Sequence, residues 1–261
     1  MTKDNPGEIQ PPFSSDDGKS LIVQRSTVEA QTDYRKYKNY LRADFWFSCA
    51  YCTMCESEAG GHRFTIDHYE PRSARPDLET VYENLFYACD ACNERKGDRC
   101  PPASARAVGY RIFRSDQEAR TEHFEQKGIR LEAKGGSKVG DYTINALDLN
   151  RGELRQLRTL RRRLWEAEVA VSHGIMALRS FPIDRLPSHV KGAALRAINE
   201  MLDVVGDVEA NVEKVLANYA MSAVLEDGTV TQEELERRKV RVQRLRDIQK
   251  EHPGNWRGRK A

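Results

Sequence analysis

Two pairs of cysteines with the spacing Cys-x2-Cys constrain the fold of this chain more than any other sequence feature. The second pair is Cys89 and Cys92, and five of the six cysteines lie between residues 49 and 92. One turn of backbone can present both sulfurs of such a pair to a single ion, and two pairs complete the tetrahedral thiolate set that zinc prefers. The sequence therefore predicts a structural four-cysteine Zn²⁺ site that joins two distant segments.

The first pair can be chosen in two ways, because Cys49 with Cys52 and Cys52 with Cys55 have the same spacing. The apolar residues 45–47 are expected to form a short strand that leads directly into Cys49, which favours the first choice. A buried thiol without a metal is the usual explanation for an isolated cysteine, but it is a poor explanation for five at this spacing.

The cellular compartment decides whether these cysteines bind metal or form disulfides. The N-terminal segment is polar with three prolines, and the chain has no run of about 18 apolar residues that could span a bilayer. We therefore expect a soluble, cytoplasmic protein, whose reducing environment favours thiolate ligands. Charged residues make up 31% of the chain but leave a net charge of only +2, so overall charge does not identify a nucleic-acid partner.

The chain is expected to contain two lobes, because its 261 residues exceed the usual size of one domain. Residues 1–20 are rich in Pro, Gly, Ser and Asp and are predicted to be a disordered leader. Residues 21–150 hold the cysteine pairs, residues 151–250 have helical periodicity, and residues 251–261 are predicted to be a frayed basic tail.

Local patterns predict both helices and short strands in the first lobe. An amphipathic helix is expected over residues 28–42, a strand over residues 62–68 and a short helix over residues 91–96. Residues 110–113 and 129–131 alternate between apolar and polar and are expected to form a small hairpin or edge strands. The predicted fold class is α+β.

The second lobe is predicted to be helical. From Gly152 leucines recur every three or four residues, which predicts a helix that runs to about Arg179. Further apolar stripes predict helices over residues 194–205, 208–225 and 235–248, separated by proline and glycine.

The dipeptide Asp67-His68, between the two cysteine pairs, is the candidate for chemistry. A neutral imidazole can take a proton from water at physiological pH, and a carboxylate can hold a hard cation. Hydrolysis of a phosphodiester needs both functions. Alone the dipeptide is a weak signal, since a histidine near an apolar strand is usually a core residue, but its place between two metal-binding pairs strengthens it.

Several segments together resemble the HNH endonucleases, which have the ββα-metal fold. They are residues 49–52, 66–73, 82–89 and 92–98, with the flanks 37–38 and 147–151. The resemblance covers roughly residues 34–158 and points to a zinc-containing bacterial branch of that family. It implies a zinc-stapled HNH nuclease module over residues 21–150, followed by an α-helical lobe.

The resemblance also implies roles for individual residues. His68 would be the general base, Asp67 and Asn93 would hold a single catalytic Mg²⁺ or Mn²⁺, and Asn84 would brace the loop that orients His68. Asn93 stands where the family name has a histidine, and an amide oxygen is a suitable ligand for a hard cation. The resemblance favours zinc ligands at four cysteines and leaves Cys55 outside. These are Cys49, Cys52, Cys89 and Cys92.

The implied function is a metal-dependent endonuclease that nicks or cleaves DNA, and the branch includes proteins of bacterial anti-phage systems. The competing hypothesis is a zinc-bearing module that binds nucleic acid or protein without catalysis. The helical lobe is expected to offer a surface for a regulatory protein partner. Nothing in the residues distinguishes DNA from RNA, because phosphate contacts read neither sugar nor base.

Basic residues around the dipeptide are expected to contact substrate phosphates. Those near it are Arg72, Arg75, Arg95, Lys96 and Arg99. A second group, Arg151, Arg155, Arg158 and Arg162, would form a stripe along the first long helix. A solvated helix face explains that stripe equally well.

Overall fold

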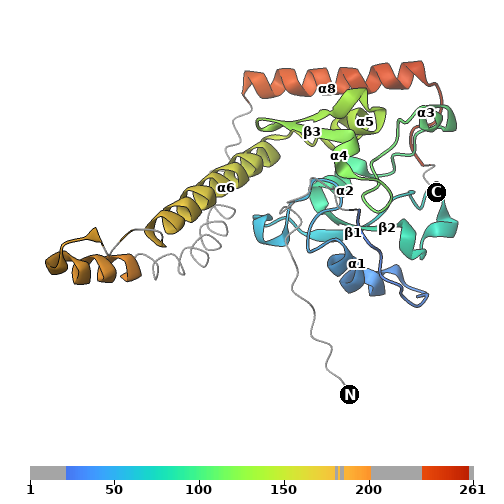
Figure 1. The fold of residues 1–261 in the computed structure, drawn as a ribbon. Helices are drawn as coiled ribbons and strands as arrows, with labels where there is room; N and C mark the ends of the chain where they lie inside the picture. The colour runs from blue at the N-terminus through green and yellow to red at the C-terminus, as the bar shows by residue number, and fades with distance from the viewer. Residues whose placement is uncertain (1–21, 180–181, 183–184, 201–230, 259–261) are drawn as a thin grey trace.

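The structure, a computed structural model, describes residues 22–179, 182, 185–200 and 231–258 (Figure 1). The predicted leader over residues 1–20 and the predicted helix over residues 208–225 lie outside the described residues, as does the end of the helix expected over 194–205. Residues 188–200 are helical. No described helix is both long and apolar enough to cross a membrane.

A ββα unit forms the centre of the fold. Strand β1 (Phe64–His68) pairs antiparallel with β2 (Leu85–Cys89), and helix α2 (Asp90–Lys96) follows β2 without a loop. The register places His68 opposite Leu85 and Phe64 opposite Cys89. Gly97 ends α2 with a positive φ of 48°, which a residue without a side chain adopts readily. The predicted strand and short helix are therefore present.

The N-terminal helix begins later than the sequence predicted. Asp33 caps a 3-10 turn (Tyr34–Tyr37) by accepting from the Arg35 N–H, and α1 (Lys38–Asp44) continues from that turn. The predicted strand over residues 45–47 is wrong. Trp46 and Phe47 have positive φ values of 48° and 55°, because the chain turns sharply at the end of α1.

A second antiparallel pair, β3 (Phe124–Lys127) and β4 (Arg130–Ala133), forms the hairpin of this lobe. The prediction that residues 110–113 belong to it is wrong. Tyr110, Ile112 and Phe113 are buried, but they pair with no strand among the described residues. The Tyr110 N–H donates to the Ala105 carbonyl (2.9 Å) in a local turn. The Phe113 N–H donates to Thr143 Oγ1 (2.9 Å), and the Ile112 carbonyl accepts from the Tyr69 hydroxyl (2.6 Å).

Short helices complete the lobe. They are α3 (Ala103–Ala107), α4 (Arg120–His123) and α5 (Lys138–Leu147), with 3-10 turns at Glu56–Glu58, Pro76–Leu78, Tyr82–Asn84 and Lys134–Gly136. Helix α6 (Gly152–Arg179) covers the range that the sequence predicted, up to the last described residue of this segment. Figure 1 shows its first turns beside the lobe and the remainder extending away from it.

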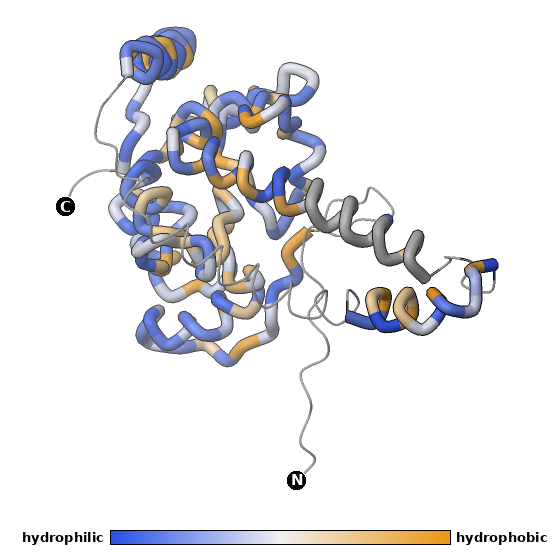
Figure 2. The backbone as a smooth tube through the Cα atoms, turned by 90° about the vertical axis from the view of Figure 1, so that its left-hand side faces the viewer, coloured by the Kyte–Doolittle hydropathy of each residue, from blue (hydrophilic) through white to orange (hydrophobic). Residues whose placement is uncertain are grey.

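Helix α8 (Gln232–Glu251) returns to the first lobe and lies across α5 (Figure 1). Figure 2 views α8 nearly end-on and shows mainly hydrophilic residues, but Leu245 and Ile248 are buried in the same core as Leu41 and Phe86. Because one core extends from α1 to α8, the last helix is packed on the lobe that holds the cysteine pairs.

The residues after α8 differ from the predicted frayed tail. Trp256 is buried, and its carbonyl accepts from the Cys100 N–H (2.8 Å). The Gly258 N–H donates to the Asp98 carbonyl (2.7 Å), and a Cβ at Gly258 would lie 1.9 Å from Ser73 Oγ. Residues 256–258 are therefore a packed part of the lobe, and the lack of a side chain at Gly258 allows the close approach.

Candidate functional site

Four buried cysteines come together where the first turn after α1 meets the β2–α2 junction. The four are Cys49, Cys52, Cys89 and Cys92. Their sulfur atoms all lie within 4.8 Å of one another, and the Sγ atoms of Cys52 and Cys89 are 3.8 Å apart. Tetrahedral coordination with a Zn–S distance of about 2.3 Å requires sulfur separations of about 3.8 Å. The cluster thus has the ligand number and spacing of a closed tetrathiolate metal site.

The structure adopts the first of the two spacings for the N-terminal pair. The Thr53 N–H donates to the Cys49 carbonyl (2.9 Å), so the backbone closes a turn that presents Cys49 and Cys52 together. Cys55 lies outside the group, with its Sγ atom 3.2 Å from Ser48 Oγ. The cluster contains the expected pair, Cys49 and Cys52, although the strand used to support that choice does not form.

Arginines surround this cluster. A guanidinium nitrogen of Arg151 lies 3.6 Å from Cys92 Sγ, and Arg120 and Arg161 donate to the carbonyls of Tyr51 (2.9 Å) and Thr53 (2.7 Å). Four thiolates around a divalent ion carry a net charge of −2, which these cations offset. The roles of Arg120 and Arg161 cannot be read from the sequence, because no spacing rule connects these residues with the cysteines.

His62 links the cluster to α6 through two carboxylates. Its Nε2 atom lies 2.9 Å from Glu153 and its Nδ1 atom 2.8 Å from Asp90, the residue after Cys89. The hydrogen bond to Glu153 is the main cause that raises the pKa of His62 to about 9, with Asp90 adding to it and burial opposing it. His62 is therefore charged at neutral pH.

We expect the stabilising contribution of His62 to depend on pH. Because its pKa rises on folding, this contribution is fully present below the unfolded pKa of about 6.5 and is lost as pH rises through about 9. The urea unfolding free energy of wild type should exceed that of His62→Gln at pH 6 and approach it at pH 9.5. A difference that stays constant over this range would contradict the prediction.

Asp67 lies on the face of β1 that packs against α2. Its side chain is 4% exposed, and each carboxylate oxygen has one donor. Oδ1 accepts from Lys96 Nζ (3.0 Å) and Oδ2 accepts from the Tyr51 hydroxyl. Burial is the largest cause that raises the pKa of Tyr51 well above its ordinary value, followed by the charge of Asp67.

His68 follows on the opposite face of β1, as alternation in a strand requires. Its Nε2 atom lies 2.9 Å from the Glu79 carbonyl oxygen, an acceptor, so this nitrogen carries the proton and Nδ1 carries the lone pair. Burial is the main cause that lowers the pKa of His68, which keeps the imidazole neutral at physiological pH. The ring of Tyr34 packs edge-on against that of His68, with the ring centroids 4.8 Å apart.

Asn84 fastens the segment between β1 and β2. Its Oδ1 atom accepts from the Glu70 N–H (2.8 Å), and its Nδ2 atom donates to the carbonyls of Glu70 (3.1 Å) and Leu78 (3.2 Å). Leu78 precedes Glu79, the partner of His68. Asn84 is therefore placed to hold the backbone that orients the imidazole.

Asn93 lies one turn before Lys96 on α2 and faces the same side of β1 as Asp67. Its Nδ2 atom donates to Thr65 Oγ1 (2.9 Å), while Lys96 pairs with Asp67 two residues further along the strand. The structure thus brings Asp67 and Asn93 to one strand–helix interface and places His68 at the end of the strand, on the other face.

The donor set at this interface suits a hard cation bound by few protein oxygens. A carboxylate has about four lone-pair sites, of which Asp67 uses two, and no hydrogen bond from the described residues ends on Asn93 Oδ1. Mg²⁺ commonly binds one or two carboxylates and takes its other ligands from water and phosphate. The ammonium of Lys96 is the opposing feature, because it already balances the charge of Asp67.

Comparison with known proteins supports the same interpretation. Residues 52–99 match the family model for HNH endonucleases. This segment is an HNH endonuclease domain. It contains Asp67, His68, Asn84 and Asn93, and the four-cysteine cluster is consistent with a zinc-stapled variant. No curated protein matches the chain.

The basic residues predicted around the HNH domain fall into two groups. Arg72 and Arg75 are exposed, each paired with a nearby carboxylate, and Arg162 is exposed on α6. The others form contacts within the fold. Lys96 differs most from the expectation, because it is 0% exposed. The other four each donate a hydrogen bond inside the protein: Arg95 to Ala91, Arg99 to Arg95, Arg155 to Glu234 and Arg158 to Leu149.

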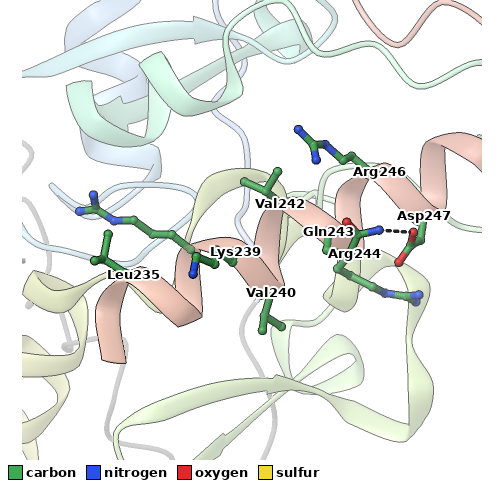
Figure 3. Close-up of a pocket in the computed structure, with 9 residues that line it drawn as sticks. Leu235, Lys239, Val240, Val242, Gln243, Arg244, Arg246 and Asp247 are labelled. Carbon is green, nitrogen blue, oxygen red and sulfur yellow. Dashed lines mark hydrogen bonds between the residues drawn. The ribbon is translucent and has the colours of Figure 1, made fainter. Parts of the chain in front are cut away.

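A groove lies outside the HNH domain, on the exposed face of α8 (Figure 3). It is lined by Leu235, Arg238, Lys239, Val240, Val242, Gln243, Arg244, Arg246 and Asp247. Gln243 donates to Asp247 within it (2.7 Å). The groove combines apolar and basic side chains, and it belongs to α8 and not to the β1–α2 interface.

Proposed function

We propose that this chain is a metal-dependent endonuclease that hydrolyses phosphodiester bonds of DNA, with His68 as the general base and zinc in the four-cysteine cluster. The observation that carries the proposal is the orientation of His68. Its Nε2–H points to the Glu79 carbonyl (2.9 Å), so the unprotonated Nδ1 is left to accept a proton, directly after a buried carboxylate in an HNH domain.

The proposed reaction begins when His68 Nδ1 takes a proton from a water molecule. The water oxygen forms a bond to phosphorus, and the bond between phosphorus and the leaving sugar oxygen breaks. That oxygen leaves with the electron pair and takes a proton from the solvent. Asp67 and Asn93 would hold a Mg²⁺ or Mn²⁺ ion, which would stabilise the negative charge that develops on the phosphate and leaving oxygens. Asn84 acts at a distance, by fixing the backbone that orients the imidazole.

Arg72 and Arg75 are the proposed phosphate contacts, because both follow His68 closely and more than half of each side chain is exposed, at 55% and 51%. Contacts of this kind bind DNA and RNA alike. A role in a bacterial anti-phage system and a regulatory protein partner on the helical lobe stay predictions from the sequence.

The activity can be tested on supercoiled plasmid DNA, single-stranded DNA and RNA, each with Mg²⁺ or Mn²⁺ and with no added divalent ion. We expect wild type to nick plasmid only with the metal, and His68→Ala to be slower by about 10²-fold or more, because loss of a general base costs at least that factor. The readout is conversion of supercoiled to open-circular DNA.

A matched control is His189→Ala, which removes an exposed histidine from the helical segment 188–200 and should leave nicking unchanged. Equal activity of wild type and His68→Ala on every substrate would overturn the proposal and favour a binding module without catalysis.

A further inference from the structure

The first zinc-binding turn reaches directly into the proposed catalytic site. Tyr51 lies between the ligands Cys49 and Cys52, is 1% exposed, and donates its hydroxyl hydrogen to Asp67 Oδ2. A single side chain therefore connects the four-cysteine cluster with the carboxylate proposed to hold the catalytic ion.

Three contacts fix the position of Tyr51. Its ring lies parallel to that of Phe86, with the centroids 6.0 Å apart and an angle of 7° between the planes. Its carbonyl accepts from Arg120 (2.9 Å), and the N–H of the preceding Ala50 donates to the Tyr87 carbonyl on β2 (2.8 Å). The hydroxyl is thus held in place by the metal-binding turn and by the strand it packs on.

Tyr51 also balances a competing contact. Lys96 Nζ binds Asp67 Oδ1 (3.0 Å) and the His68 carbonyl (2.6 Å), and Lys96 is fully buried. If Oδ2 had no donor, the carboxylate could rotate and direct both oxygens toward the ammonium. That rotation would strengthen the internal ion pair at the expense of a bound cation.

We infer that Tyr51 is a positioning residue, which uses the zinc-binding turn to hold Asp67 in the orientation that binds the catalytic divalent ion. This inference rests on the proposed function. It means that the structural metal site sets the geometry of the catalytic one, and that the two sites are one hydrogen-bonded unit.

The test is Tyr51→Phe, which removes only the hydroxyl. The matched control is Tyr82→Phe, because Tyr82 is also a buried tyrosine whose hydroxyl donates to a buried carboxylate, Asp44 (2.6 Å). For each protein we would measure zinc content, the Mn²⁺ affinity without DNA by electron paramagnetic resonance, and the Mn²⁺ concentration that gives half-maximal nicking.

We expect Tyr51→Phe to keep one zinc per chain and to need about 10- to 100-fold more Mn²⁺ in both measurements, since partners of a metal ligand typically contribute that factor. Its nicking rate at saturating Mn²⁺ should approach that of wild type. Tyr82→Phe should match wild type in all three measurements.

Equal Mn²⁺ requirements for Tyr51→Phe and Tyr82→Phe would overturn the inference, and the loss of activity in His68→Ala would still support the proposed function. Wild type that binds no Mn²⁺ and nicks no DNA would overturn both. A lower zinc content in Tyr51→Phe would also overturn the inference, because it would make the effect of Tyr51 structural.

Discussion

Cys92→Ser is expected to lose its metal and to unfold the ββα unit. Cys92 is fully buried, and the cluster it completes joins the turn after α1 to the β2–α2 junction. A structural zinc site contributes on the order of 10 kcal/mol to apparent folding stability, as much as the entire stability of many domains. Zinc should fall below one per chain, and thermal unfolding followed by circular dichroism should lose its cooperative transition.

The matched control for this prediction is Cys55→Ser, three residues beyond Cys52. Its thiol lies outside the four-cysteine group and contacts Ser48 instead. Cys55→Ser should retain one zinc per chain and a melting temperature close to that of wild type. A stable, metal-free Cys92→Ser protein would show that the cysteines pack without an ion.

Lys96→Met is expected to destabilise the protein by about 3–5 kcal/mol, because it leaves the buried Asp67 carboxylate without its cation. If Asp67 is a metal ligand, a divalent ion can supply the missing positive charge. Addition of Mn²⁺ should therefore raise the melting temperature of Lys96→Met by more than that of wild type. Urea unfolding in the absence and presence of Mn²⁺ measures both effects.

Lys239→Met provides the comparison. Lys239 also pairs with a carboxylate, that of Glu236 on the same helix, but its side chain is 70% exposed. Exposed pairs contribute about 0–1 kcal/mol, so this variant should be nearly as stable as wild type and indifferent to Mn²⁺. If Mn²⁺ raises the melting temperature of Lys96→Met by no more than that of wild type, the result would count against Asp67 as a metal ligand.

The sequence predicts the centre of this fold well because the relevant signals are local. The Cys-x2-Cys spacing needs only one turn of backbone, and the strand that ends in Asp67 and His68 shows its own alternation. The match of residues 52–99 to HNH endonucleases agrees with the fold inferred from those residues.

The residues that the sequence could not place have their partners far along the chain. The sequence predicts Lys96, the last residue of α2, as an exposed phosphate contact. Instead its ammonium binds the buried carboxylate of Asp67, 29 residues earlier, and the side chain lies in the interior. Arg158 belonged to a plausible basic stripe, yet it donates to the Ile129 carbonyl (3.2 Å), 29 residues earlier, and is buried. A charge pattern along one helix does not reveal which face a neighbouring element covers.

Residues 45–47 show a different limit. Three consecutive aromatic residues have high strand propensity, but two of them adopt positive φ so that the chain can enter the turn that presents Cys49 and Cys52. The tertiary structure around this turn therefore determines the backbone conformation, and the strand propensity of the side chains does not.

The packing of residues 256–258 on residues 98–100 has a consequence for synthesis on the ribosome. Arg257 Nη1 bonds to Asp98 Oδ1 (2.6 Å) across a separation of 159 residues. At about 5–20 residues per second, translation of that interval takes about 8–30 s. During this time the nascent chain already carries all four cysteines and His68 but lacks the segment that covers the end of α2. The HNH domain therefore reaches its final packing only late in translation, well after its own sequence has been made.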